Sequence, residues 1–254
     1  MRSSLRPLLF VLAFAGAAVL SGCATPPPAS DPEALAEFKE TNDPLEPMNR
    51  VFYNVNNALD VVILRPIALG YRAAVPQPVQ TGVHNVLTNL STPVVFGNDV
   101  LQGKPQRAAE TMARLLINTT LGLGGIFDVA NRLGVPQHDS DFGMTLAVWG
   151  LPDGVFLFLP VLGPTNPRDT VGFGVDTLAD PFNWLGQGDT VEALRWTRTG
   201  LGAVDARSRV IDDLDKITSQ ALDPYATIRS LSRQHRKSQI DDVRNSPAFR
   251  PAPK

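Results

Sequence analysis

The sequence predicts a mainly α-helical protein. Apolar residues recur at intervals of three and four between Val51 and Ile63, which is the spacing of one face of an α-helix. Other segments with this spacing follow a proline or a capping residue, as at Pro105 and Asp223. Strand-like alternation is scarce, and the Asn-Gly turn of a tight hairpin does not occur in the sequence. These three observations favour an all-α fold.

The first 22 residues have the form of a bacterial lipoprotein signal peptide. Two arginines precede an apolar run from Leu8 to Leu20, and Ser21 and Gly22 then lead to Cys23. Cys23 is the only cysteine of the chain, which excludes an internal disulfide. We expect Cys23 to carry a diacylglycerol and an N-acyl chain as the first mature residue, and we expect no other cofactor. The alternative is an ordinary signal peptide that happens to end near a lone cysteine.

A lipidated Cys23 ties the mature chain to a membrane from outside the cytoplasm, since two or more acyl chains anchor stably where one does not. Ala24 follows it, and in enterobacterial lipoproteins the absence of Asp here points to the outer membrane. The proline-rich residues 26–30 suit a tether. We therefore expect a signal peptide (1–22), a lipidated N-terminus with tether (23–41), a helical domain (42–236) and a disordered tail (237–254).

The composition argues against a nucleic-acid partner and for a surface that is partly out of water. The net charge is -2, and charged residues make up 19% of the chain, below the usual quarter or so. Low charge combined with 20 glycines and 22 prolines is unusual for a surface fully exposed to water.

The stretch from Phe142 to Gly163 is mostly apolar, and Asp153 is its only charge. A membrane-spanning helix needs roughly 20 uninterrupted apolar residues, whereas glycines and prolines interrupt this stretch. One straight spanning helix is therefore not expected. Two interpretations stay open: a buried core segment of a soluble domain, or a broken element at membrane depth packed against other helices.

The helix expected from Asn49 to Leu64 combines an apolar face with a polar face that is almost uncharged. The polar face holds Asn54, Asn56, Asn57 and Asp60. Such a face suits a polar interior as well as it suits an ordinary amphipathic core helix. We expect Arg65-Pro66 to break this helix.

The remaining elements follow from the same signals. Thr92 before Pro93 reads as an N-cap that restarts a helix, and a glycine-rich corner from Gly122 to Gly125 suggests a tight turn or close helix approach. We expect further helices over residues 66–74, 79–90, 92–103, 105–121, 165–180, 190–217 and 224–235.

Catalytic and metal-binding patterns do not stand out in the sequence. His84, His138 and His235 lie far apart, outside any metal-ligand spacing, and no serine lies in a G-x-S-x-G context. The turn from His138 to Asp141 reads as a solvated turn. We therefore expect a protein that is not an enzyme and holds no metal.

Several strings resemble the MlaA (VacJ) family of outer-membrane lipoproteins, and together they cover roughly residues 42–230 in order. They are Asn42–Arg50, Leu64–Pro66, Tyr71-Arg72, Val75-Pro76, Asn118–Asp128, Asp141–Leu146, Leu159-Pro160, Gly163-Pro164, Arg168-Asp169 and Asp223–Tyr225.

The resemblance implies an all-helical ring embedded in the inner leaflet of the outer membrane, with a central channel. Family members remove mislocalised phospholipids from the outer leaflet and pass them to an MlaC-like periplasmic carrier, which maintains lipid asymmetry. Trimeric porins of the OmpC or OmpF type are family partners. The alternative is a scaffold lipoprotein that only tethers partner proteins to the envelope.

A channel of this kind needs a polar wall, because a bare charge at the bilayer centre costs several kcal/mol. We expect the helix from Asn49 to Leu64 to supply it. The candidate channel wall consists of Asn54, Asn57 and Asp60, and the candidate gating residues are Val55, Gly122, Gly124 and Gly125.

Overall fold

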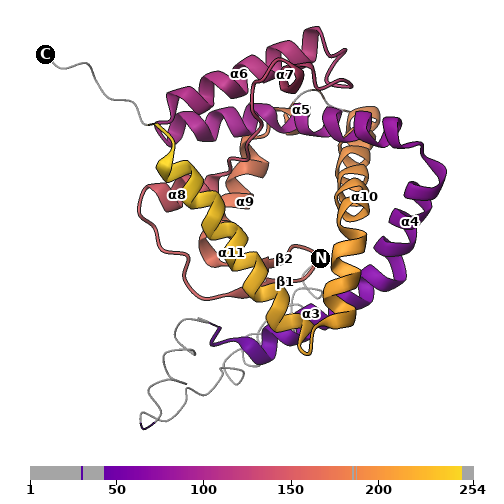
Figure 1. The fold of residues 1–254 in the computed structure, drawn as a ribbon, viewed down its shortest axis with the longest axis vertical. Coiled ribbons are helices and arrows are strands. Elements are labelled where there is room, and N and C mark those ends of the chain that lie inside the picture. Colours follow the sequence, from indigo (N-terminus) through magenta and orange to yellow (C-terminus); the bar gives the residue numbers. More distant parts are fainter. Residues whose placement is uncertain (1–29, 31–42, 185, 187, 248–254) are drawn as a thin grey trace, which may run out of the picture. The chain divides into compact units, whose positions relative to one another are not determined.

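The computed structural model describes residues 30, 43–184, 186 and 188–247, and most of them are helical, which confirms the mainly α prediction (Figure 1). The chain divides into two compact units, Met1–Ala58 with Asp153–Pro167, and Leu59–Pro152 with Arg168–Lys254. Cys23 and the expected tether up to residue 41 lie outside the described residues, apart from residue 30.

The first unit combines helix α3 (Glu46–Leu59) with a small antiparallel hairpin. The hairpin pairs β1 (Leu157–Leu159) with β2 (Gly163–Thr165), Leu157 opposite Thr165. Its strands have three residues each, too few for alternation to reveal them in the sequence. Helix α3 begins at Glu46, and the main-chain carbonyl of Asp43 accepts a hydrogen bond from the Glu46 amide at 3.2 Å.

The described part of the second unit is built from helices alone. They are η1 (Asp60–Leu64, a π-helix), α4 (Arg65–Ala74), α5 (Gln77–Leu101), α6 (Pro105–Thr120), α7 (Val129–Arg132), α8 (Phe142–Val148), α9 (Pro167–Ala179), η2 (Pro181–Asn183, a 3₁₀ turn), α10 (Asp189–Gln220) and α11 (Pro224–Asn245).

Four helices of the second unit form a closed circuit of packing contacts. Helix α5 packs on α10, α10 on α11, α11 on α8, and α8 on α5 again (Figure 1). Helix α6 packs along α5, and α4 packs along α10. A closed circuit differs from a layered globular fold, in which helices stack over one shared core.

Two prolines that we expected to break helices do not. Pro66 lies in the first turn of α4, where a missing N–H costs little, and the preceding π-helix carries the chain into α4 without a break. Pro93 lies inside α5, which runs unbroken past it. The Thr92 hydroxyl donates to the Thr88 carbonyl at 3.1 Å, so Thr92 is an interior residue of α5 and not an N-cap.

The predicted disordered tail from residue 237 is wrong as far as Asn245, because α11 continues to that residue. The helix persists because Ile240 and Val243 pack with Met144 and Ala147 of α8 in a small apolar core. Residues 248–254 lie outside the described part of the chain.

The apolar stretch from Phe142 to Gly163 is interrupted, as its glycines and prolines predict. It starts as α8 and, after an irregular segment, enters the hairpin of the first unit. Over the described residues, the structure contains no helix long and apolar enough to cross a membrane.

Candidate functional site

Helices α5 and α6 bury mainly polar side chains, in contrast to the apolar contact between α8 and α11. On α6 the buried face consists of Arg107, Ala108, Thr111, Arg114 and Asn118, while Leu116 is 59% exposed. Water-soluble helices normally arrange these residues the other way round. Helix α6 therefore has its apolar side outward and its polar side against the protein.

The same inversion appears on other elements of both units. The residues that α5 buries are Gln80, Gly82, Asn89, Asn98 and Asp99. Large apolar side chains are exposed along the run from α3 through η1 to α4: Val51, Val55, Leu59, Val61, Val62, Ile63, Ile67 and Leu69. An exposed apolar surface of this extent marks contact with a membrane or a partner.

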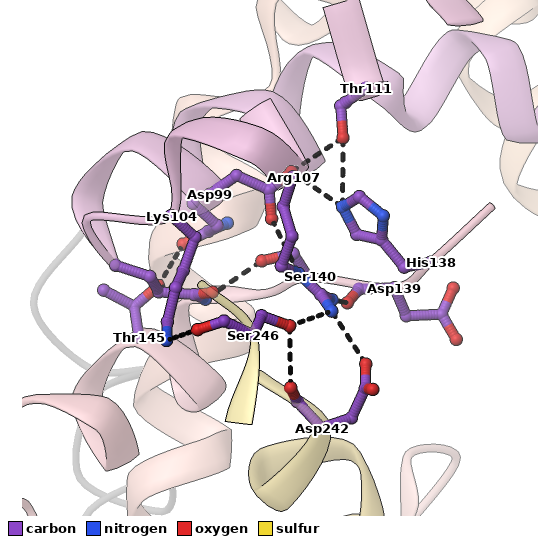
Figure 2. A network of polar contacts seen from close by, with 12 residues as sticks. Asp99, Lys104, Arg107, Thr111, His138, Asp139, Ser140, Thr145, Asp242 and Ser246 are labelled. Atoms are coloured by element: carbon purple, nitrogen blue, oxygen red, sulfur yellow. Dashed lines mark hydrogen bonds and ion pairs between the residues drawn. The ribbon is translucent and has the colours of Figure 1, made fainter. Parts of the chain in front are cut away.

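Buried Asp99 is the centre of a polar network at one end of α5 (Figure 2). Its carboxylate accepts a hydrogen bond from the Thr111 hydroxyl at 2.7 Å and lies 2.8 Å from Nε2 of His138. Arg107 donates to the Asp242 carboxylate at 2.7 Å and to the Asp139 carbonyl at 3.0 Å. The network thus joins α5, α6 and α11 to the segment around His138. The His138 side chain is only 10% exposed and Ser140 is buried, whereas Asp139 is exposed, so the turn that we expected to be solvated is solvated only in part.

Lys104 binds the C-terminal end of α11 next to this network. Its ammonium group donates to the main-chain carbonyls of Arg244 and Ser246, at 3.1 and 2.6 Å. Burial lowers the pKa of Lys104, and the charge of Arg107 lowers that pKa further. A cation at the last carbonyls of a helix also complements the helix dipole.

Arg236 of α11 holds two further elements of the circuit. Its guanidinium donates two hydrogen bonds to the carboxylate of Asp141, at 2.6 and 2.7 Å. It donates two more to the carboxylate of Asp169, both at 2.9 Å. Burial opposes the charge on Asp169, but hydrogen bonds and charge from Arg236 and Arg168 outweigh burial and lower the pKa of Asp169. Asp141 is also the N-cap of α8, so one cation joins α8, α9 and α11.

A second charged cluster joins η1 and α4 to α10. Arg207, which is buried, donates to both carboxylate oxygens of Asp60 at 2.7 and 2.8 Å. Arg65 pairs with Asp215 in the same way, at 2.7 and 3.3 Å. Polar and charged contacts, more than an apolar core, therefore fix the helices of the second unit.

A family model described as MlaA lipoprotein matches residues 41–239. The chain belongs to the MlaA family. A family member from Haemophilus influenzae, named intermembrane phospholipid transport system lipoprotein MlaA, is 33% identical over 91% of this chain and 89% of its own. The protein of the same name from Escherichia coli K12 is 34% identical over 84% of this chain and 81% of its own.

A solved structure from work on the structural basis for maintenance of bacterial outer membrane lipid asymmetry has a similar fold. It matches with a TM-score of 0.67 and 32% sequence identity, over 78% of this chain and 98% of that chain. The MlaA family and its mainly helical fold are thus shown from sequence and from structure alike.

The predicted channel-wall residues have different surroundings. Asn54 and Asn57 are exposed on α3 of the first unit, as is Val55, the first candidate gating residue. Asp60 belongs to the second unit, where the Arg207 pair holds both of its carboxylate oxygens. The wall and gating assignments remain predictions.

The glycine corner is a site of close backbone approach, as predicted. A Cβ on Gly122 would overlap the carbonyl oxygens of Phe127 and Asn118. A Cβ on Gly125 would lie 2.6 Å from the Cβ atom of Asn89. Gly124 has open space but a φ of 72°, in the left-handed region that favours glycine.

A small polar pocket lies next to this corner. Its lining residues come from α5, α6 and the segment after the corner: Asn85, Thr88, Asn89, Thr92, Arg114, Asn118, Asp128 and Gln137. Burial works against ionised Asp128, but hydrogen bonds from Arg114, Asn118 and the Asn131 amide outweigh it and lower the pKa of Asp128.

Sequence reasoning missed two asparagines of α3 that hold the hairpin of the first unit. Asn49 donates to the Phe156 carbonyl at 3.1 Å and accepts from the Phe158 amide at 2.9 Å. Two helical turns later, Asn56 donates to the Leu159 carbonyl and accepts from the Val161 amide, both at 2.8 Å. Their spacing of seven residues places them on one face, but nothing in the sequence marks main-chain groups as their partners.

Within the described residues, no group of histidine, cysteine or carboxylate side chains has the arrangement of a metal site. The polar clusters are ion pairs and hydrogen bonds that join helices. The relatives named above are transport lipoproteins, in keeping with a protein that is not an enzyme.

Proposed function

We propose that this chain is the outer-membrane lipoprotein of an intermembrane phospholipid transport system, anchored through Cys23 and embedded from the periplasmic side in the inner leaflet. It removes mislocalised phospholipids from the outer leaflet and passes them to an MlaC-like periplasmic carrier. Trimeric porins of the OmpC or OmpF type hold it in place. The role of its named relatives in phospholipid transport and its family membership support this proposal.

The inverted burial of the helices carries the proposal. Apolar side chains exposed along α3, η1 and α4 suit acyl chains, whereas buried Asp99, Arg107 and Asn118 make the inside polar. A phospholipid needs this combination, because its headgroup must avoid hydrocarbon while its tails remain there. A protein anchored only by a lipid tether needs no such surface.

In the proposed mechanism a polar path through the protein carries the headgroup, and no covalent step occurs. Asn54 and Asn57 offer amide groups that bind a headgroup without holding it as firmly as full charges would. Asp60, paired with Arg207, adds a charge pair of no net charge, which suits a zwitterionic headgroup. Val55 and the corner of Gly122, Gly124 and Gly125 are the proposed gating positions.

Deletion of the gene tests the transport role. We expect phospholipid to accumulate in the outer leaflet and the cells to become sensitive to detergent with a chelator, and a plasmid copy should restore both. An unchanged outer-leaflet phospholipid content in the deletion strain would overturn the proposed role.

Leucine substitutions test the channel wall separately. The double variant Asn54→Leu with Asn57→Leu should reach normal protein level and membrane location while outer-leaflet phospholipid rises. Asn131→Leu, at an exposed amide of α7, is the matched control and should keep normal asymmetry. Normal asymmetry in the double variant would remove the channel-wall assignment and leave the transport role standing.

Removal of the lipid anchor separates an embedded transporter from a tethering scaffold. The variant Cys23→Ala, exported behind a cleavable signal, should still partition with membranes or need detergent, because apolar surface remains exposed on its helices. A monomer that stays soluble without detergent would instead favour the scaffold.

A further inference from the structure

The N-terminal half of α10 differs from the rest of that helix in what it exposes. Between residues 193 and 203 the exposed side chains are small or apolar: Ala193, Leu194, Trp196, Thr197, Thr199, Gly200 and Ala203. From residue 209 onward the exposed residues include Arg209, Asp212, Asp213 and Lys216. The first turn of α10, before this run, exposes Asp189 and Glu192. We propose that the part of the N-terminal half from Ala193 to Ala203, together with Trp184, is immersed in the hydrocarbon of a lipid layer, whereas the C-terminal half of α10 lies outside the hydrocarbon.

The exposed side chains of this half cover about 220° of the helix circumference at about 100° per residue, because positions 193, 194, 196, 197, 199 and 200 leave only the sector of Arg195 and Arg198 uncovered. Trp196 is 70% exposed and Leu194 is 64% exposed. A surface helix in water normally exposes a charged or polar face of this width, whereas this exposed face is small or apolar and is left uncovered by the described part of the chain.

The hydrogen-bond donors in this region are already satisfied inside the chain. The hydroxyls of Thr197 and Thr199 donate to carbonyls one turn back, at 2.8 and 3.1 Å. The indole N–H of Trp196 donates to Glu192 at 3.4 Å, and that of Trp184 donates to the Leu178 carbonyl at 2.6 Å. In hydrocarbon each unsatisfied donor would cost several kcal/mol, so internal satisfaction matches an apolar solvent.

The two arginines of this half are also held by the protein. Arg198 pairs with Asp180 at 2.6 Å, and its guanidinium covers the Phe182 ring at 5.1 Å. Arg195 donates to the carbonyls of Phe182 and Gly186, toward the N-terminal end of the helix. Both guanidinium groups therefore have partners inside the chain.

Lipid fits this surface better than a protein partner does. A protein interface carries about one hydrogen bond per 100–200 Å², whereas the donors named here are used internally. The uncharged exposed run from Ala193 to Ala206 is about 20 Å long at 1.5 Å per residue. This is shorter than the about 30 Å of a bilayer core, so the helix enters the layer without crossing it.

Tryptophan fluorescence in vesicles tests the inference, using the full mature, acylated chain. The chain contains three tryptophans, at positions 149, 184 and 196. Replacing two by Phe leaves one reporter at Trp196 or at Trp184. The control places the only tryptophan in the C-terminal half through Asp213→Trp with all three native tryptophans replaced by Phe, and Asp213 is mostly exposed.

Phosphatidylcholine vesicles with brominated acyl chains should remove most of the emission of Trp196 and of Trp184, while aqueous acrylamide has little effect on either. The Asp213→Trp reporter should behave in the opposite way. Equal quenching of all three reporters by acrylamide, without loss in brominated vesicles, would overturn the proposal. So would a photo-crosslinker at position 196 that attaches to a protein, and not to lipid, in cell envelopes.

This inference rests on the proposed membrane embedding, but its readout is independent of transport. If the reporters are quenched by brominated acyl chains while transport in cells fails, the lipid contact assigned to α10 still holds. If transport is normal while the reporters are not quenched, the lipid contact assigned to α10 is wrong and the proposed transport role is unaffected.

Discussion

Replacing Arg236 with Met should destabilise the protein strongly. The substitution preserves much of the length of the side chain but removes a guanidinium that makes four close contacts with Asp141 and Asp169. Arg236 is mostly buried and its pKa is raised, because the hydrogen bonds and charges of the two aspartates outweigh the effect of burial. Its loss removes this partner from the carboxylate of Asp141 and leaves that of Asp169 with Arg168, at 3.0 Å.

Breaking a buried ion pair by removing one partner costs about 3–5 kcal/mol. Asp141 is 40% exposed, so solvent screens part of its charge, and we expect a loss of about 3 kcal/mol. For a chain of this size, 1 kcal/mol lowers Tm by about 2–4 °C, so the expected shift is on the order of 10 °C. Loss of helical circular dichroism on heating, in one detergent for all variants, measures it.

Lys216→Met is the matched control, because it also exchanges a cation for Met. Lys216 lies 3.8 Å from Asp213 with both side chains largely exposed, and such pairs contribute about 0–1 kcal/mol. Adding Asp169→Asn to Arg236→Met should restore part of the lost stability, because it removes one stranded charge. If the Tm of Arg236→Met equals the Tm of Lys216→Met, the stabilising role assigned to Arg236 is refuted.

Three further predictions follow from local geometry. Gly122→Ala should lower Tm more than Gly124→Ala, because the first overlaps backbone carbonyls whereas the second costs only left-handed strain of about 1–2 kcal/mol; equal Tm values would contradict this. Stability should fall as pH drops below about 4, because the lowered pKa of Asp169 stabilises the fold only while Asp169 is ionised, and Asp169→Asn should flatten this acid dependence. Asn56→Leu should release the hairpin at a cost of about 1–3 kcal/mol, seen as faster proteolysis of residues 157–165 than in Asn57→Leu.

Helix positions were largely predictable from the sequence, whereas helix ends next to prolines were not. The spacing of apolar residues located α6, α10 and most of α5, because that spacing depends only on helix geometry. The effect of Pro66 and Pro93 depends instead on whether the surroundings tolerate a missing N–H. A π-helix before Pro66 was not visible in residue types, so a break was the wrong expectation.

The polar interior was only partly predictable. The glycine corner stood out in the sequence, whereas Asn54 and Asn57 of the uncharged face of α3 are exposed and their place in a polar interior stays a prediction. The buried charges came from residues that look like ordinary surface positions. Arg107 and Arg236 reach Asp242 and Asp141 across more than ninety residues of sequence. Pairs at such separations leave no periodic signal, so only the fold brings them together.

Periodicity also cannot say which face of a helix is inside. The sequence of α6 has the same alternation of apolar and polar faces whether water or lipid surrounds the protein, since the pattern records only that two environments exist. Burial decides between the two, because Arg107, Thr111 and Arg114 are enclosed while Leu116 is exposed. In water this arrangement would desolvate charged groups and expose apolar surface to solvent, and both effects cost free energy. The arrangement becomes favourable where the outside solvent is hydrocarbon and each enclosed charge has a partner such as Asp128 or Asp242.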